Sequence, residues 1–194
     1  MFMSNSAVRE TPFLATAKAT AAAQWVEVPL AGGKFELKLW GKFPPRWLAN
    51  LTSGLAAKGI TIHKGYANKL SPTIWQGTFE LSRLDAGPRG QLDYVALAQQ
   101  GEKNAVATAI QLEHVAVNPC DDALFVEIKG DDSVGFLMTL LKTFAFCSLY
   151  PAEVSIDTPH GRVHDRFWLK GLGGSAPSTA LGEGLRLELG KLLR

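Results

Sequence analysis

Apolar residues along the chain switch several times between a spacing of two, typical of strands, and a spacing of three to four, typical of helices. In 35–41 the apolar positions alternate with polar ones and predict a strand, whereas in 44–59 they lie on one side of a predicted helix. That helix follows two prolines, and Gly59 marks its end. The elements predicted in this first part are a strand, a helix, two strands, a helix and a strand, at 35–41, 44–59, 60–67, 73–84, 92–100 and 108–118.

The same order of elements returns in the second part of the chain. A strand, a helix, two strands and a closing helix are predicted at 123–130, 133–147, 149–158, 162–171 and 176–193. A shift of 89 positions aligns Gly41 with Gly130 and Leu51 with Leu140, so the chain repeats a pattern more than it repeats residues. The repeated order is β-α-β-β-α-β, and the second copy lacks its last strand. The strand-like segment 23–31 is the candidate to cover the edge left open.

This order predicts an α+β protein made of two ferredoxin-like units, in which helices cover one face of an antiparallel sheet. The first unit is expected at 24–118 and the second at 119–194, after a mobile segment at 1–23 that is rich in Ala, Thr and Ser. A single unit leaves sheet edges uncovered, and tandem or dimeric units commonly join their sheets. We therefore expect the two units to associate through their sheets.

Composition and charge remove some classes of partner. The 194 residues are 46% hydrophobic and 20% charged, as in an ordinary globular protein with a core. A formal net charge of +2 indicates neither a nucleic acid nor an anionic membrane as partner. No apolar run approaches the roughly 18 residues of a membrane span, and the N-terminus lacks the apolar region of a signal peptide. Cys120 and Cys147 match no metal or redox spacing, so unpaired thiols and a cytoplasmic location are expected.

Residues 112–171 carry the motifs of a known family. A strand is followed by Asp132-Ser133-Val134-Gly135-Phe136-Leu137, a D-x-x-G-L-L-like pattern that opens an apolar helix. A strand ending in "SIDT" (155–158) and a return strand with a V-x-D-x-F pattern (163–167) come next. This stretch resembles an ACT domain, most of all those at the C-terminus of the bifunctional uridylyltransferase/uridylyl-removing enzymes of nitrogen control. The first repeat is similar only in the order of its elements and in a few apolar positions.

The resemblance implies a free-standing regulatory protein with tandem ACT domains, because the chain has no room for the catalytic domains of those enzymes. In ACT domains the loop between the first strand and the first helix lies at a unit interface and binds small ligands, typically amino acids. The implied ligand is an amino acid or a similar metabolite, with glutamine as the first trial by analogy. The implied protein partners are a regulated enzyme and a second copy of the chain. We expect this homodimer to form through sheet edges or through the helix face with Leu181, Leu185 and Leu189.

The candidate ligand-binding loop consists of Asp131, Asp132, Ser133, Val134, Gly135 and Phe136. Its carboxylates suit an α-amino group, and the amides at a helix N-terminus suit a carboxylate. Asp132 is also a candidate N-cap, which would place Gly135 in the first helical turn. Two explanations of this glycine stay open: it leaves room for a ligand, or it lets the helix pack tightly on its own sheet. In the first case, Gly135→Val should abolish binding and leave the fold largely intact.

The first repeat departs from this pattern at 42–47, where Arg46 replaces the glycine and no acidic residue precedes it. Three interpretations are open. Arg46 and Trp47 narrow the pocket, or a cation at Lys42 or Arg46 pairs with an anion, or Arg46 is exposed and Trp47 belongs to the core. If only one repeat binds a ligand, we expect it to be the second.

Other polar residues indicate no further site. His160 and His164 have a spacing that suits a metal on a helix, but here they flank a predicted turn and strand, so no metal is expected. Asp165 shares the strand parity of its apolar neighbours and is expected to point inward, toward a backbone amide or an arginine. The glycine-rich 171–175 matches no phosphate-binding motif and is predicted to be a connection.

No nucleophile, acid–base pair or cofactor motif converges in the sequence, so we expect neither an enzyme nor a cofactor. Two functions from different classes remain. The first is a sensor that binds a small molecule and passes its state to a partner. The second is a ligand-free interaction or dimerisation module with an ACT-like fold.

Overall fold

The computed structural model describes residues 22–84, 92–100, 109–133 and 135–194. The elements of its first half are β1 (Gln24–Pro29), β2 (Lys34–Lys42), α2 (Trp47–Ala57), β3 (Ile60–Lys69), β4 (Ile74–Arg83) and α3 (Tyr94–Gln100). Those of its second half are β5 (Leu112–Cys120), β6 (Ala123–Asp131), α4 (Phe136–Phe146), β7 (Tyr150–Asp157), β8 (Arg162–Lys170) and α5 (Thr179–Gly190). The mobile segment predicted at 1–23 lies outside the described residues, except for its last two.

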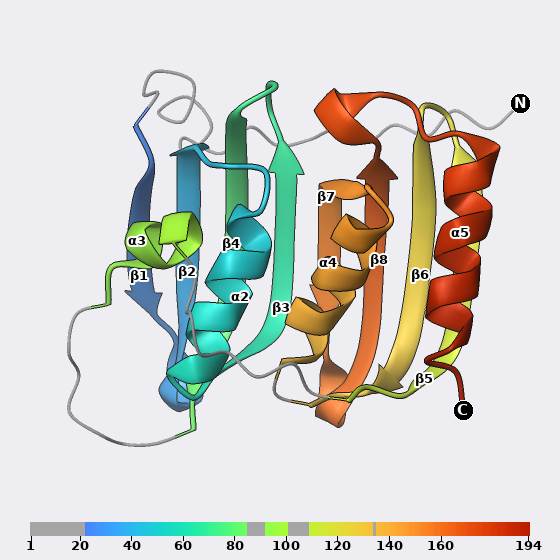
Figure 1. The fold of residues 1–194 in the computed structure, drawn as a ribbon. Helices are drawn as coiled ribbons and strands as arrows, with labels where there is room; N and C mark the ends of the chain where they lie inside the picture. Colours follow the sequence, from blue (N-terminus) through green and yellow to red (C-terminus); the bar gives the residue numbers. More distant parts are fainter. Residues whose placement is uncertain (1–21, 85–91, 101–108, 134) are drawn as a thin grey trace, which may run out of the picture.

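The eight strands form one sheet in the order β1-β2-β4-β3-β7-β8-β6-β5, and each neighbouring pair is antiparallel. Figure 1 shows α2, α3, α4 and α5 together on one face of this sheet. The alternation that predicted the strands is visible in their burial: every second residue of β4, from Trp75 to Leu81, is buried beneath the helices. The predicted fold class, α+β with tandem ferredoxin-like units and helices on one face, is confirmed.

The two halves repeat one arrangement, with equivalent registers. Leu37 of β2 lies opposite Phe79 of β4, and Val126 of β6 lies opposite Phe167 of β8. All four of these residues are fully buried. The helices α2 and α4 follow β2 and β6 and contact each other above the junction of the halves. The repeat that was visible in the sequence therefore corresponds to a structural repeat.

The assignment of the edge strands from the sequence is wrong. The segment expected at 23–31 does form a strand, but β1 pairs with β2 and lies at the outer edge of the first half. The strand expected to close the first unit, β5, pairs with β6 instead. Both pairs are hairpins joined by short turns, and a short connection favours pairing between consecutive strands. Each half therefore has the order ββαββα, with its edge strand at the beginning.

β5 pairs with β6 up to its last residue, Cys120. Strand pairing alone therefore assigns β5 to the second half and divides the chain before it. The separation into domains at 24–118 and 119–194 stays a prediction, because the strands belong to one continuous sheet. The halves meet at β3 and β7, where residues from Lys64 opposite Asp157 to Asn68 opposite Glu153 pair in register. The main chain itself thus joins the two halves.

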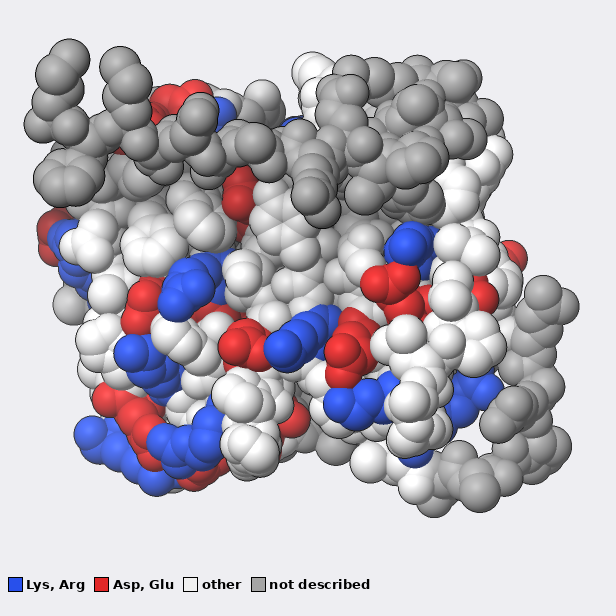
Figure 2. Space-filling view, turned by 180° about the vertical axis from the view of Figure 1, so that it is seen from behind, with Lys and Arg blue, Asp and Glu red and all other residues white. Residues whose placement is uncertain are grey.

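The face of the sheet opposite the helices is polar. Figure 2 shows Lys and Arg interspersed with Asp and Glu across it. Several of these charges form ion pairs, such as Lys34 with Glu80 at 2.7 Å and Lys129 with Glu127 at 3.2 Å. Exposed pairs of this kind contribute little to stability, typically about 0–1 kcal/mol each. The hydrophobic core therefore lies on the helix side of the sheet.

The closing helix α5 belongs to that core. Leu185 and Leu189 are fully buried, and Leu181 packs against the core as a partly buried residue. The expectation that this leucine face joins two chains is wrong, because the face is used against its own sheet. Among the described helices, none is long and apolar enough to cross a membrane.

Candidate functional site

The loop between β6 and α4 has a different geometry from the one predicted. The helix begins at Phe136, and Gly135 occupies the N-cap position with φ 86° and ψ 1°, in the left-handed region. Asp132 is not the N-cap; its amide donates a hydrogen bond to the carbonyl oxygen of Gly161 at 2.9 Å. The amide of Phe136 donates to the carbonyl oxygen of Ser133 at 2.9 Å, which closes the turn before the helix.

This backbone conformation supplies a third explanation of the glycine, beyond the two that the sequence left open. Residues with a Cβ adopt a positive φ at a cost, whereas glycine does so readily. The expectation that Gly135→Val leaves the fold largely intact is therefore wrong, because valine would strain the turn whatever space surrounds it. The substitution cannot serve as a clean test of ligand binding.

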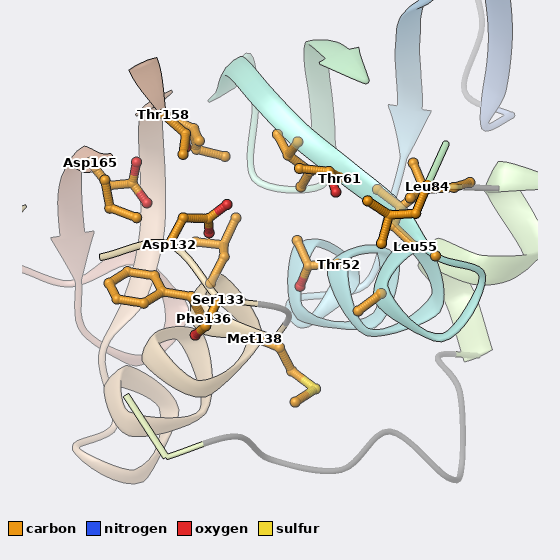
Figure 3. A pocket seen from close by; sticks show the side chains of 18 residues that line it. Thr52, Leu55, Thr61, Leu84, Asp132, Ser133, Phe136, Met138, Thr158 and Asp165 are labelled. Carbon is orange, nitrogen blue, oxygen red and sulfur yellow. The ribbon is translucent and has the colours of Figure 1, made fainter. Parts of the chain in front are cut away.

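A cavity lies beside this loop, between the two halves of the molecule (Figure 3). Its volume is about 70 Å³. This is smaller than the roughly 300–1,000 Å³ of typical small-molecule sites, so the cavity suits a ligand of few atoms. The first half contributes residues from α2 and β3 together with Leu84, and the second half contributes the β6–α4 loop, the start of α4 and parts of β7 and β8. The cavity therefore exists only because the halves are joined.

The lining combines a small polar group with apolar walls. Its hydroxyl and carboxyl side chains are those of Thr52, Thr61, Asp132, Ser133, Thr158 and Asp165. The rest of the lining is apolar or glycine: Leu55, Ala56, Gly59, Ile60, Ile62, Leu84, Gly135, Phe136, Leu137, Met138, Ile156 and Val163. Within the described part of the chain, the lining includes no lysine, arginine or histidine. The ionisable side chains of this described lining are thus the two carboxyl groups of Asp132 and Asp165.

Four of the six residues predicted for the site line the cavity: Asp132, Ser133, Gly135 and Phe136. Asp131 does not, because its carboxylate forms ion pairs with Arg162 and Arg194 outside the cavity. Val134 lies outside the described residues. The loop therefore takes part in the cavity, although whether it binds a ligand stays a prediction.

Asp165 is the most deeply buried polar group of the site, with 2% of its surface exposed. Its Oδ1 accepts a hydrogen bond from the amide of Asp157 at 3.2 Å, which confirms both the inward orientation and the backbone partner expected from the sequence. Burial raises the pKa of Asp165 to about 8, the Asp157 amide opposes this shift, and the carboxylates of Asp132 and Asp157 add to it. The side chain is therefore largely protonated at neutral pH.

Asp132 lies on the same side of the cavity as Asp165 (Figure 3). It is more exposed than Asp165, yet desolvation raises its pKa above the ordinary value. The backbone amide of Ser133 and the nearby His63 oppose that shift. Two carboxyl groups with raised pKa values thus face one cavity, an arrangement that is common at functional sites.

Sequence reasoning recognised Asp165 as an inward-facing residue but did not assign it to the site. The missing information was the pairing of β6 with β8, in which Asp131 lies opposite Arg162 and Gly130 opposite Val163. This register brings the beginning of β8 next to the β6–α4 loop. The V-x-D-x-F pattern that carried the resemblance was a signal that could have joined the two.

The corresponding place in the first half is filled by aromatic side chains. Trp47 is 1% exposed, and its ring centroid lies 5.0 Å from that of Phe43 and 5.5 Å from that of Trp75. Arg46 is exposed and holds the N-cap position of α2. Of the three interpretations of this loop, the one with an exposed Arg46 and a core Trp47 is confirmed.

The other polar residues singled out in the sequence lie elsewhere. His160 lies in the turn Pro159–Gly161, and the Nε2 atom of His164 is 3.2 Å from Oε1 of Glu127. The described residues contain no group of three or more His, Cys, Asp or Glu side chains placed to hold a metal. The glycine-rich 171–175 forms a short 3₁₀ turn and a link to α5, whose N-cap is Ser178.

Comparisons with known proteins add little to this geometry. No family model and no curated protein sequence matches the chain. Among solved structures, it is similar to a crystal structure of aspartate kinase from Synechocystis, with 14% identity and a TM-score of 0.45. The match covers 82% of this chain and 27% of the aspartate kinase chain. A likeness this weak carries no argument, so the site must be interpreted from its own chemistry.

Proposed function

We propose that this chain is a non-catalytic regulatory protein with tandem ACT-like units, which binds an amino acid or a similar small metabolite between its two halves. The observation that carries the proposal is the cavity itself: both halves line it, and its lining includes four of the six residues that the ACT resemblance assigned to a ligand. The ACT assignment rests on the motifs in 112–171.

The position of the cavity is suited to regulation. Thr52 and Leu55 lie on α2, whereas Phe136 and Met138 lie on α4, and these two helices contact each other. A ligand that contacts both helices would stabilise one arrangement of the halves over others. A partner enzyme that contacts the helix layer would then respond to the ligand. The non-catalytic part of the proposal rests on the sequence, in which no nucleophile and base converge.

A thermal-shift screen of the purified protein against amino acids, nucleotides and 2-oxoacids tests the proposal. A ligand at 100 times its Kd should add about 2.7 kcal/mol to the free energy of unfolding. We expect at least one amino acid or related amine to stabilise the protein. Thr61→Phe, which fills the cavity, should abolish that stabilisation. Thr78→Phe, on another strand and outside the lining, is the matched control and should preserve it.

The absence of any stabilising compound, or equal stabilisation of wild type and Thr61→Phe, would favour the ligand-free interaction module.

We also propose a homodimer formed through a sheet edge. Among the described strands, β1 is the outermost of the first half. Next to this edge, on the face away from the helices, Val26 is 37% exposed and Val28 is 39% exposed, which supports a contact there. Light scattering at micromolar concentration should show about twice the 21.0 kDa of the chain, and Val28→Lys should shift it to the monomer.

The proposed location is the cytoplasm. Both cysteines, Cys120 and Cys147, are free thiols in the structure, as the sequence led us to expect. Free thiols are usual where the cell keeps cysteine reduced. The location itself rests on the sequence.

A further inference from the structure

We infer that the ligand of this cavity is a small primary amine with an apolar substituent, whose ammonium group is held by Asp132 and Asp165 and whose carboxylate, if it has one, finds no cationic partner. The inference rests on the proposed function and narrows its ligand class. It assigns to Asp165 a binding role that the sequence did not suggest.

The carboxyl group of Asp165 is available to a donor. Among the described residues, its only hydrogen-bond partner is the Asp157 amide, which donates to Oδ1. No lysine, arginine or histidine of the described chain lies within ion-pair distance of Asp165. Figure 3 shows the carboxyl groups of Asp132 and Asp165 on one side of the cavity, with Thr52 and Thr61 across from them. An ammonium carries three donors and a positive charge, so it satisfies two carboxylates at once.

The remainder of the cavity suits an apolar group. Leu55 and Ile60 from the first half and Phe136, Ile156 and Val163 from the second are each at most 5% exposed, and all line the space beside the carboxyl groups. Burying an aliphatic or aromatic substituent against such walls is favourable by roughly 25 cal/mol for each Å² of apolar surface. A charged or strongly polar substituent would instead lose its hydration without compensation.

The acidic lining disfavours anions. A ligand carboxylate or phosphate would meet two carboxyl groups and no cation from the described residues of the lining. Any carboxyl group that is ionised would repel the anion at short distance, and such repulsion discriminates strongly between ligands. The polar side chains left to a carboxylate are the hydroxyl groups of Thr52, Thr61, Ser133 and Thr158, and they are neutral. An amine should therefore bind better than the amino acid with the same side chain.

Binding of an amine should also displace a proton. An ammonium next to Asp165 favours its ionised form, so the carboxyl group releases its proton when the amine binds near neutral pH. The titratable groups around Asp165 are Asp132 on the loop, Asp157 on β7 and, beside Asp132, His63 on β3. Because a primary amine stays protonated to about pH 10, its affinity should rise between pH 5 and pH 8.

Calorimetry of the full chain with three probes of one carbon skeleton tests the inference. Isopentylamine carries only the amine of L-leucine, and 4-methylpentanoate carries only its carboxylate. We expect isopentylamine to bind at least tenfold more tightly than L-leucine, and 4-methylpentanoate to show no binding heat. Titrations in two buffers of different ionisation enthalpy should reveal release of a proton with isopentylamine at pH 7.

Variants assign the effect to the two carboxyl groups. Asp165→Asn and Asp132→Asn should each weaken isopentylamine binding at least tenfold; Asp132 is exposed, so its variant should fold normally. Asp122→Asn removes an exposed carboxylate that pairs with Lys170 outside the cavity, and it should leave the affinity unchanged.

The outcomes separate this inference from the proposed function. Tighter binding of L-leucine than of isopentylamine, or binding that neither Asp165→Asn nor Asp132→Asn weakens, would overturn the amine and leave a metabolite sensor. Binding of a ligand from the screen while all three probes fail would likewise overturn the amine inference and keep the proposed metabolite sensor. Failure of every probe and every screened compound would overturn both proposals.

Discussion

The two halves of the sheet differ at one pair of equivalent positions. In the first half, β4 places Trp75 opposite Gly41 of β2 and Gly77 opposite Leu39. In the second half, β8 places Val163 opposite Gly130 of β6 and Asp165 opposite Ile128. The backbone at these places follows one plan, but the side chains differ in size and polarity. A tryptophan corresponds to a valine, and a glycine corresponds to a buried carboxylic acid.

The difference decides where space remains. Around Trp75 the rings of Trp47, Phe43 and Phe79 fill the layer between sheet and helix, with centroids of Trp47 and Phe79 6.5 Å apart. A Cβ at Gly77 would lie 2.9 Å from Cε2 of Phe79, so this position has no room for a side chain. In the second half, the smaller Val163 and the turn at Gly135 line the cavity between the halves. One repeat therefore serves as a filled core and the other as a candidate site.

The largest expected effect comes from opening the filled half. Trp47→Ala removes a side chain that is 1% exposed, and such truncations typically cost about 3–5 kcal/mol. Urea denaturation of wild type and variant would measure the loss. Because the ligand cavity lies elsewhere, stabilisation by a ligand from the screen should persist in the variant at a temperature where it is folded. A decrease of less than about 1 kcal/mol in the free energy of unfolding would contradict the assignment of Trp47 to the core.

The next effect concerns the pH dependence of stability and Asp165. Its pKa is about 8 in the folded protein and near the ordinary 3.8 in the unfolded chain, so the folded state holds the proton more tightly. The free energy of unfolding should therefore fall as the pH rises from about 4 to about 8. Asp165→Asn removes this dependence, and near pH 8 we expect it to be more stable than wild type by about 2 kcal/mol or more, at about 1.4 kcal/mol for each pKa unit.

Denaturation at pH 5 and pH 8 would measure this difference, with Asp122→Asn as the control. The difference in stability between wild type and Asp165→Asn should be smaller at pH 5 than at pH 8, because the unfolded chain loses this proton near pH 4 and the folded protein near pH 8. An equal stability difference at both pH values would show that Asp165 does not titrate in this range. The first half offers the contrast, since Gly77 places no titratable group at the equivalent position.

A smaller effect is expected at the two helix beginnings. Gly135 has φ 86°, whereas Arg46, at the same place in the first half, has φ −102° and is exposed. Alanine in the left-handed region costs about 1–2 kcal/mol, so Gly135→Ala should destabilise the protein by that amount. Arg46→Ala should change the stability by less than about 0.5 kcal/mol. Equal effects in chemical denaturation would contradict a conformational role of the glycine.

Much of the fold follows from local patterns in the sequence. Alternation with a period of two located β2, β4, β6 and β8, and a period of 3.6 located α2, α4 and α5, because burial of one face imposes these periods on any strand or helix. The inward orientation of Asp165 follows from the same parity. The loop at 131–136 was identified by its resemblance to a family motif, and four of its residues do line the cavity.

Local patterns did not reveal the conformation of Gly135 or the pairing of the edge strands. The sequence allowed β5 to close the first unit, yet the short turn after Cys120 pairs it with β6. A helix starting at Asp132 and one starting at Phe136 have nearly the same apolar periodicity, so periodicity cannot tell them apart. The backbone torsion of Gly135 depends on how its turn is held in the fold, where the Asp132 amide donates a hydrogen bond to the carbonyl oxygen of Gly161.

The sequence by itself determined that the chain holds two similar α+β units, and that the second carries an acidic loop before its first helix. Only the tertiary structure decided that β3 and β7 pair, and this pairing places Thr52 and Thr61 of one half across a cavity from Asp132 and Asp165 of the other. The physical reason is the separation of the residues along the chain. Periodicity reports which face of an element is buried, whereas a site between two halves depends on residues about 70 to 115 positions apart.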